Sequence, residues 1–357
     1  MKYERPEYLA EGIKVTEFGS AFFGDTVLKV PVFDRPISIR ENFKRAYKRE
    51  NPVWVPNALT DGYVGMLAQL NGMPDADWSR NDRYGWTDWF GAQWTYVPEA
   101  GGPMLTPGTQ FLDDITNWKT GVKFPDLDLY DWETNCKKFM DAYDGEKVIA
   151  VNIGLGCTER LVSLLGGYTE AMLAMAIEPE TVREFLEAFV DWEITVVDKV
   201  LEYVPVDMIT YHDDWGTERD TFFSEKMMEE IVFEPTKRLF GHIKSKGVCV
   251  ELHSCGHIAR FIPYMIEMGV DLMQIQTRCN DIAAYKVKYG DKIGFDLSAM
   301  PEGDVTADKM IQAVRELVDN MGAGGGLYAG VFSGDPEVLW HGTSELYYYS
   351  REKYERE

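Results

Sequence analysis

Two hydrophobic periods alternate along the second half of the chain. Short apolar runs predict strands at 147–153, 206–211, 248–253, 270–276, 292–297 and 327–332. Between them apolar residues recur at the helical period, which predicts helices near 158–175, 180–203, 225–246, 257–268, 306–321 and 335–350. Strands that alternate with helices indicate a parallel sheet. Two earlier strands, at 52–56 and near 83–92, bring the number to eight, and the sequence therefore predicts a (β/α)8 TIM barrel.

The first part of the chain is less regular. Residues 1–35 are predicted to form an N-terminal extension, and residues 38–41 (SIRE) resemble a capping box that opens a short helix. Residues 59–145 are rich in Gly, Asp, Trp and Pro, which predicts a loop-rich insertion over the barrel mouth. We expect one domain over 1–357, because α/β barrels often exceed the usual domain length. An open doubly wound sheet is the alternative, but no G-x-G-x-x-G follows the first strand.

Composition narrows the range of partners and compartments. The formal net charge is -23 at pH 7, and such a surface repels phosphate backbones, so we expect no nucleic-acid partner. The five cysteines are odd in number and irregularly spaced, which indicates a reducing compartment. The first residues are charged and no apolar run reaches membrane length, so we expect a cytoplasmic protein without a membrane partner.

Reactive side chains gather at the end of the strand 248–253. Because strand side chains alternate between faces, the apolar set beginning at Val248 is predicted to face the helices, and Glu251 and His253 the barrel interior. If the strand continues, Cys255 joins the interior set. An imidazole and a thiolate two residues apart can share one Zn²⁺. This spacing alone does not distinguish a zinc pair from a packed histidine beside an inert cysteine.

A catalytic zinc site needs a third protein ligand and an open position. Several residues are predicted at the same end of the barrel and could supply it: Cys279, Cys157, Asp213, Asp214 and Glu218. The remaining cysteines, Cys136 and Cys249, are interpreted as structural residues.

Two polar and aromatic clusters add further candidates. Residues 212–216 (HDDWG) follow the fourth strand, and Asp214 there could cap a turn, orient a substrate or support the metal. Residues 84–91 (YGWTDWFG) could either cover the barrel mouth or form an apolar slot with Asp88 as its polar group. The sequence leaves both choices open.

Several segments together resemble the uroporphyrinogen decarboxylase-like superfamily, and within it the corrinoid-dependent methyltransferases. They are 37–43, 53–56, 87–91, 213–217, 223–224, 251–256 and 267–271. The resemblance implies a (β/α)8 barrel in which His253 and Cys255 bind zinc. In that branch a later cysteine follows the final strand, near a Gly-Gly run. Here the run is 324–326 and the position is Ser333, a poor zinc ligand, so Cys279 becomes the expected third metal ligand.

The resemblance also bears on the reaction. True decarboxylases carry an arginine-rich segment after the first strand, whereas residues 55–61 contain no arginine. Thiol methyltransferases of the coenzyme M type depend on the cysteine that Ser333 replaces. The expectation that remains is transfer of a methyl group from a small donor, first of all an aromatic methyl ether, to cob(I)alamin on a separate corrinoid protein; methylamines would also suit. Asp88 or Asp214 would protonate the departing phenolate.

The aromatic substrate would lie among four side chains: Trp86, Trp89, Tyr211 and Trp215. Three alternatives stay open at this point, namely a coenzyme M-type methyltransferase, a uroporphyrinogen decarboxylase, and a barrel without enzymatic activity that docks a corrinoid protein. A homodimer is expected from the superfamily alone.

Overall fold

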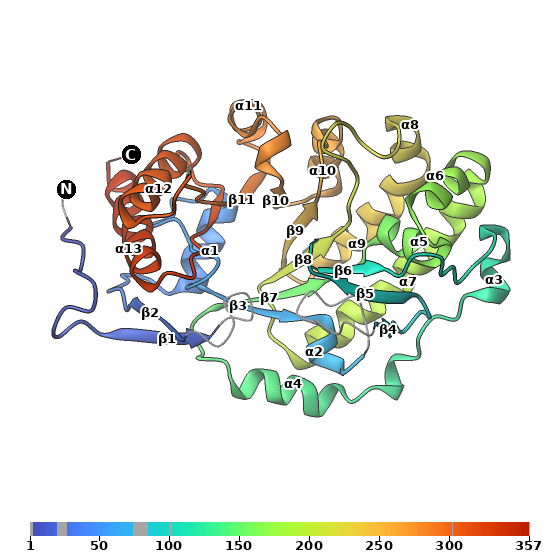
Figure 1. Ribbon diagram of the computed structural model, residues 1–357, viewed down its shortest axis with the longest axis horizontal. Coiled ribbons are helices and arrows are strands. Elements are labelled where there is room, and N and C mark those ends of the chain that lie inside the picture. The colour runs from blue at the N-terminus through green and yellow to red at the C-terminus, as the bar shows by residue number, and fades with distance from the viewer. Residues whose placement is uncertain (1–2, 20–26, 74–84, 100–101, 302, 357) are drawn as a thin grey trace.

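The centre of the molecule is a curled, seven-stranded parallel sheet (Figure 1). The computed structural model describes residues 3–19, 27–73, 85–99, 102–301 and 303–356. Along the sheet the strands are β12 (Leu327–Gly330), β11 (Gly294–Ser298), β10 (Leu272–Ile275), β9 (Cys249–Ser254), β8 (Met208–His212), β7 (Val148–Ile153) and β3 (Gly62–Met66). The six strands predicted after position 147 are confirmed. Consecutive strands are always neighbours, so the sheet winds in one direction, which a doubly wound sheet does not do.

Helices connect these strands. They are α5 (Cys157–Leu165), α6 (Tyr168–Ile177), α7 (Pro179–Tyr203), α8 (Glu225–Met227), α9 (Phe233–Ser245), α10 (Ile262–Met268), α11 (Ile282–Tyr289), α12 (Ala307–Met321) and α13 (Pro336–Tyr354). Short turns complete them: the π-helical η4 (Met228–Val232) and the 3₁₀ turns η5 (Ala259–Phe261) and η6 (Thr277–Cys279). The predicted helix 158–175 is two helices, because Gly166 takes φ 84° after α5. Helix α11 was not predicted; none of its residues is fully buried, and Ile282, Tyr285 and Tyr289 pack against the core only in part.

The predicted first strand, 52–56, is wrong as a regular strand. Only a parallel bridge forms there, between Asn57 and Ala329 of β12. Its hydrogen bonds run from the Ala58 N–H to the Ala329 oxygen at 2.7 Å and from the Ala329 N–H to the Pro56 oxygen at 2.9 Å. Prolines at both ends of the segment cannot donate to a ladder, which limits pairing. The preceding helix α1 (Ile39–Lys48) begins as predicted, with Ser38 accepting from the Glu41 N–H.

The predicted strand near 83–92 does not belong to the parallel sheet. Its described part contributes β4 (Trp86–Thr87), which joins β5 (Gln93–Val97) and β6 (Gly102–Leu105) in a separate antiparallel sheet. Residues 83 and 84 lie outside the described residues. The rest of the region 59–145 holds α2 (Leu67–Asn71), α3 (Trp118–Gly121), α4 (Trp132–Asp141), and the 3₁₀ turns η2 (Ile115–Asn117) and η3 (Leu127–Leu129). The parallel strand in this region is β3, which was not predicted because two of its five residues are glycine.

The N-terminal extension is tied to the C-terminal helix. Strands β1 (Val15–Gly19) and β2 (Val27–Pro31) pair antiparallel, and β2 packs on α13. Arg5 forms ion pairs with Glu345 at 3.0 Å and with Glu352 at 2.7 Å. Both chain ends therefore lie beside α13, as Figure 1 shows. Among the described residues, no helix combines the length and the apolar character needed to span a lipid bilayer.

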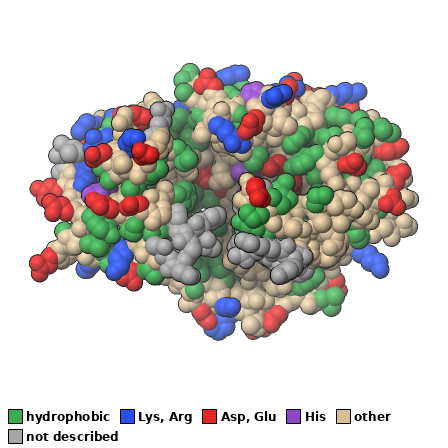
Figure 2. Space-filling view, in the orientation of Figure 1, with side chains coloured by type: hydrophobic (Ala, Val, Ile, Leu, Met, Phe, Trp, Pro, Cys, Tyr) green, Lys and Arg blue, Asp and Glu red, His purple; other side chains and the backbone are tan. Residues whose placement is uncertain are grey.

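The sheet has apolar cores on both sides. Between sheet and helices lies the larger cluster, which includes Val250 and Leu252 of β9. A second cluster lies inside the curl and includes Cys249, Met208 and Leu272. Above it, toward the carboxyl ends of the strands, the interior becomes polar. Figure 2 shows a hollow in this face of the molecule, with histidine and acidic side chains at its wall.

Candidate metal centre

Strand β9 places its side chains as the alternation predicts. Val250 and Leu252 are fully buried in the outer core, whereas Cys249 lies in the inner cluster. His253 follows on the inner face and is partly exposed. Cys255 comes directly after the strand ends at Ser254, with its side chain on the same side as His253. The interior orientation of the His253 and Cys255 pair is therefore confirmed.

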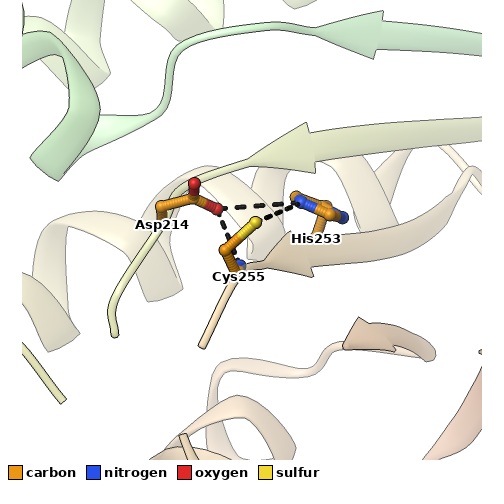
Figure 3. A group of neighbouring side chains, drawn as sticks. All are labelled: Asp214, His253 and Cys255. Carbon is orange, nitrogen blue, oxygen red and sulfur yellow. Dashed lines mark hydrogen bonds and ion pairs between the residues drawn. The ribbon is translucent and has the colours of Figure 1, made fainter. Parts of the chain in front are cut away.

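Three ligand-type side chains converge here, from the ends of β8 and β9 (Figure 3). The Cys255 Sγ lies 3.6 Å from the His253 Nε2, and the Asp214 Oδ1 lies 3.7 Å from the same nitrogen. The Cys255 backbone N–H donates to the Asp214 Oδ1 at 2.7 Å. One ligand atom from each residue lies within 4.8 Å of the other two, and no other such group occurs among the described residues.

Asp213 and Asp214, which follow β8, make different contacts. Asp213 is fully buried and accepts from the Thr158 hydroxyl at 2.6 Å, the Glu159 N–H at 2.9 Å and the Trp215 Nε1 at 2.8 Å. It thus caps the start of α5, and burial raises its pKa to about 6. Asp214 points the other way, toward His253 and Cys255. The chain direction at the end of β8 therefore selects Asp214 for the centre.

A glycine brings the two ligand-bearing loops together. Gly256 follows Cys255 and has φ 87°, a conformation that favours glycine. A Cβ at this position would lie 2.2 Å from the backbone of Gly216, which follows Asp214 by two residues. The turns after β8 and β9 can approach this closely because Gly256 lacks a side chain.

The centre is electrostatically negative. Burial and the Asp214 carboxylate raise the pKa of Cys255 to about 12. Burial, together with the charge of Asp214, holds the pKa of Glu159 well above its usual range. The Glu159 carboxylate accepts from the Tyr168 hydroxyl at 2.5 Å. A divalent cation beside these groups would reverse the thiol shift and stabilise the thiolate, and one nitrogen, one oxygen and one sulfur ligand suit Zn²⁺.

The other predicted metal ligands lie outside this group. Cys279 is on η6, and its Sγ donates weakly to Gln276 at 3.8 Å. Cys157 is buried beneath the Tyr211 hydroxyl, at 3.4 Å. Glu218 forms an exposed ion pair with Arg278 at 2.8 Å. The structure thus brings Asp214, and not Cys279, to the predicted pair.

A family model described as uroporphyrinogen decarboxylase (URO-D) matches residues 88–296, which is more than half of the chain. The chain belongs to this family. A solved methyltransferase from Methanosarcina mazei shares the fold, with a TM-score of 0.63 and 12% sequence identity over 90% of this chain and 100% of that chain. No curated protein matches.

Two further solved structures are more distant. An archaeal fructose 1,6-bisphosphate aldolase gives a TM-score of 0.35 at 15% identity, over 60% of this chain and 76% of that chain. An intracellular xylanase from Thermoanaerobacterium saccharolyticum gives 0.32 at 11% identity, over 57% and 71%. At such TM-scores neither structure bears on the function.

In this URO-D family chain, Asp88 is enclosed rather than free. Its carboxylate pairs with the buried Arg160 of α5 at 2.7 Å and accepts from the Trp94 Nε1 at 2.9 Å. It also accepts from the backbone N–H groups of Phe90 and Ala92. Asp88 therefore ties the antiparallel sheet to α5, an arrangement that does not favour the predicted role as a proton donor.

The four aromatic residues predicted to bind substrate serve in packing. Trp86 lies in a small buried cluster with Trp94 and Leu155. Trp89 packs edge-on against Trp192 of α7. Tyr211 faces the helices, where its hydroxyl bonds Glu193 at 2.9 Å, and Trp215 is completely buried. Nothing in this arrangement favours the four as a substrate slot.

Besides Glu159 of α5, three polar residues near the centre escaped the sequence analysis. Gln274 accepts from the His253 ring nitrogen Nδ1 and donates to Asp296, while Gln276 donates to the Cys255 Sγ at 3.3 Å. The signal that could have found them is strand alternation, since Gln274 and Gln276 share a face of β10 and its extension, and Asp296 is the central residue of β11.

Proposed function

We propose that the protein is a zinc-dependent methyltransferase, and that Asp214, His253 and Cys255 hold the metal. The single observation that carries this proposal is the convergence of these three side chains at the carboxyl ends of β8 and β9. Active sites of parallel α/β barrels lie at that end of the sheet. Three protein ligands leave a position open for a substrate atom, as in catalytic zinc sites.

We further infer that the sheet closes as a complete eight-stranded barrel. The bridge between Asn57 and Ala329 supports this closure, because it joins the segment before β3 to β12 at the opposite end of the sheet order. In a closed barrel the centre would open at the carboxyl ends of the strands; Figure 2 shows a hollow in this face of the molecule.

The proposed methyl donor is an aromatic methyl ether, and the acceptor is cob(I)alamin on a separate corrinoid protein. This part rests on the family resemblance of the 251–256 segment. When bound, zinc supplies a Lewis acid for the ether oxygen. His253 and Cys255 would offer the metal a nitrogen and a sulfur from the end of β9. Asp214 would offer a carboxylate from the end of the neighbouring strand β8.

Glu159 replaces Asp88 as the proposed proton donor. It lies at the start of α5, close enough to Asp214 and Cys255 to raise the thiol pKa. Burial is the largest cause of the raised pKa of Glu159 and does not depend on the charge of Asp214, so it favours a carboxyl group that can carry a proton. It can therefore give that proton to a departing oxygen at the centre and is then stabilised by the Tyr168 hydroxyl.

Decarboxylation of uroporphyrinogen is a weaker proposal for this member of the family. Such a substrate carries many carboxylates, which need cationic partners, and residues 55–61 offer none. The centre itself carries the Asp214 carboxylate, which lies beside Cys255 and raises the pKa of its thiol. A neutral methyl ether meets no such repulsion.

The test combines metal content with turnover. Protein purified without chelators should contain about one zinc per chain, and Cys255→Ser should lose most of it, whereas the matched variant Cys279→Ser should keep it. Wild type should form methylcobalamin from reduced corrinoid protein and a methyl ether, followed by absorbance. Zinc-free wild type, or normal transfer by Cys255→Ser, would refute the proposal and leave a docking function.

A further inference from the structure

A ladder of hydrogen-bonded side chains crosses the interior of the sheet and ends at His253. We call it the interior ladder; it consists of Thr210, Glu251, Asp296, Gln274 and His253. Strand register brings its members side by side: Thr210 pairs with Glu251, and Gln274 pairs with both His253 and Asp296. The ladder thus runs over four adjacent strands, from β8 to β11, and none of its first four members belongs to the proposed centre.

The distances identify which groups donate. The Thr210 hydroxyl donates to the Glu251 Oε2 at 2.8 Å, and the Gln274 Nε2 donates to the Asp296 Oδ2 at 2.5 Å. The Gln274 Oε1 lies 2.7 Å from the His253 Nδ1. An amide oxygen can only accept, so this contact requires a proton on Nδ1. The lone pair of a neutral His253 ring then lies on Nε2, which faces Asp214 and Cys255.

The orientation of the Gln274 amide follows from its contact with Asp296. The Asp296 carboxylate is buried in the interior and accepts the hydrogen bond that the Gln274 Nε2 donates, whereas an amide oxygen at that position would meet a second acceptor. On its other side Asp296 lies next to Glu251. With Nε2 held by Asp296, the Oε1 of Gln274 is the atom that faces His253.

We propose that Gln274, oriented by its hydrogen bond to Asp296, is a positioning residue that holds His253 with its proton on Nδ1 and directs Nε2 toward the centre. A hydrogen bond to the second ring nitrogen is the usual means by which proteins orient a metal-binding histidine. The tautomer concerns the metal-free chain itself; only its consequence for zinc rests on the proposed function.

The first test is the tautomer of His253 in the metal-free protein. Histidine ¹⁵N shifts, measured at about pH 8.5, where histidine is neutral, should show His253 protonated on Nδ1, with the signal assigned by its loss in His253→Gln. Gln274→Met, close in size but without hydrogen-bonding groups, should abolish this preference. The matched variant Gln276→Met changes the neighbouring contact to Cys255 and should leave the tautomer unchanged. A wild-type His253 protonated on Nε2, or an unchanged tautomer in Gln274→Met, would overturn the proposal.

The second test is zinc affinity, measured by chelator competition. Gln274→Met should raise the zinc Kd about 10- to 100-fold. Gln274→Glu keeps an oxygen facing Nδ1, and its second oxygen, protonated because it adjoins the Asp296 carboxylate, can replace the amide as donor to Asp296. It should therefore retain both the tautomer and an affinity close to that of wild type. This conservative variant also guards against misfolding of Gln274→Met. Equal Kd values for wild type and Gln274→Met would contradict the metal step. If wild type binds no zinc while Gln274→Met still alters the tautomer, the proposed function fails and the role of Gln274 stands.

Discussion

The polar residues at the end of β9 and those in the region 59–145 look equally reactive in the sequence, but the structure uses them differently. His253 and Cys255 point into the curl of the sheet with partly exposed side chains. Asp88 is held by a buried arginine, a tryptophan and two backbone groups. In the first region the side chains face one another inside the curl of the sheet, and in the second the Asp88 carboxylate joins the antiparallel sheet to α5.

The difference arises from what precedes each residue. A parallel strand fixes the direction of every second side chain, so the residues at its end have a known orientation. A loop-rich segment gives no such constraint, and its polar groups are free to satisfy one another. The same types of polar side chain therefore indicate a functional site at the end of β9 and a structural contact in the region 59–145. Variants in each region should separate function from stability.

The largest expected effect is loss of metal in His253→Ala. Removing one of three ligands should raise the zinc Kd by at least about 100-fold, since even outer contacts cost that much. Unfolding of the metal-free protein in urea should change by only about 1 kcal/mol, the worth of the bond to Gln274. His341→Ala, on α13, should alter neither quantity. Retained zinc in His253→Ala would place the metal elsewhere.

For Asp88→Asn we expect the opposite result, a loss of stability without a loss of zinc. The substitution removes the charge of the carboxylate that Arg160 contacts at 2.7 Å, and breaking a buried ion pair by changing one partner costs about 3–5 kcal/mol of unfolding free energy. Zinc content should remain that of wild type. Asp128→Asn removes an exposed partner of Lys199 in the same region and should cost less than about 1 kcal/mol. If Asp88→Asn instead keeps its stability and loses methyl transfer, Asp88 is the proton donor after all.

Most of the parallel half of the fold could be predicted from its pattern. The six strands after position 147 and the inner position of His253 follow from alternation alone. Strand β3 could not be found, because Gly62 and Gly65 dilute its apolar character. The segment at 52–56 looked like a strand, yet Pro52 and Pro56 cannot donate to a ladder.

The third ligand marks the limit of prediction at the candidate site. Asp213 and Asp214 are adjacent, and both follow β8. Only the structure shows that the Asp213 carboxylate is hydrogen-bonded to the first residues of α5, whereas Asp214 lies beside Cys255. The sequence favours Cys279 because Ser333 stands where the related enzymes have a cysteine, but the Cys279 Sγ contacts Gln276 at 3.8 Å and is not part of the group formed by Asp214, His253 and Cys255. Loop direction, which sequence pattern does not encode, decides between these candidates.

A smaller effect is expected where the two ligand loops touch. Gly256→Ala would place a Cβ 2.2 Å from the Gly216 backbone at φ 87°, so the loops must separate. The positive φ alone costs about 1–3 kcal/mol, and separation should also weaken zinc binding. Gly247→Ala is the control, because Gly247 has a similar φ of 81° with nothing within 4 Å of a Cβ. Zinc affinity should fall in Gly256→Ala only. Equal zinc affinities in both variants would show that the contact does not shape the centre.

The smallest expected effect is a dependence of zinc affinity on pH. The thiol of Cys255 keeps its proton in the metal-free protein, because burial and Asp214 raise its pKa to about 12. Zinc binds the thiolate, so binding releases this proton, and the apparent Kd should fall about tenfold for each unit of increasing pH. The range from about pH 7.5 to 9 isolates the thiol, since histidine is already neutral there. Cys255→Asp offers a carboxylate that is ionised throughout, so its slope should vanish, while Cys279→Ser should keep the slope of wild type. A wild-type Kd independent of pH would mean that zinc does not bind the sulfur of Cys255, which would leave the centre with only the two ligands Asp214 and His253.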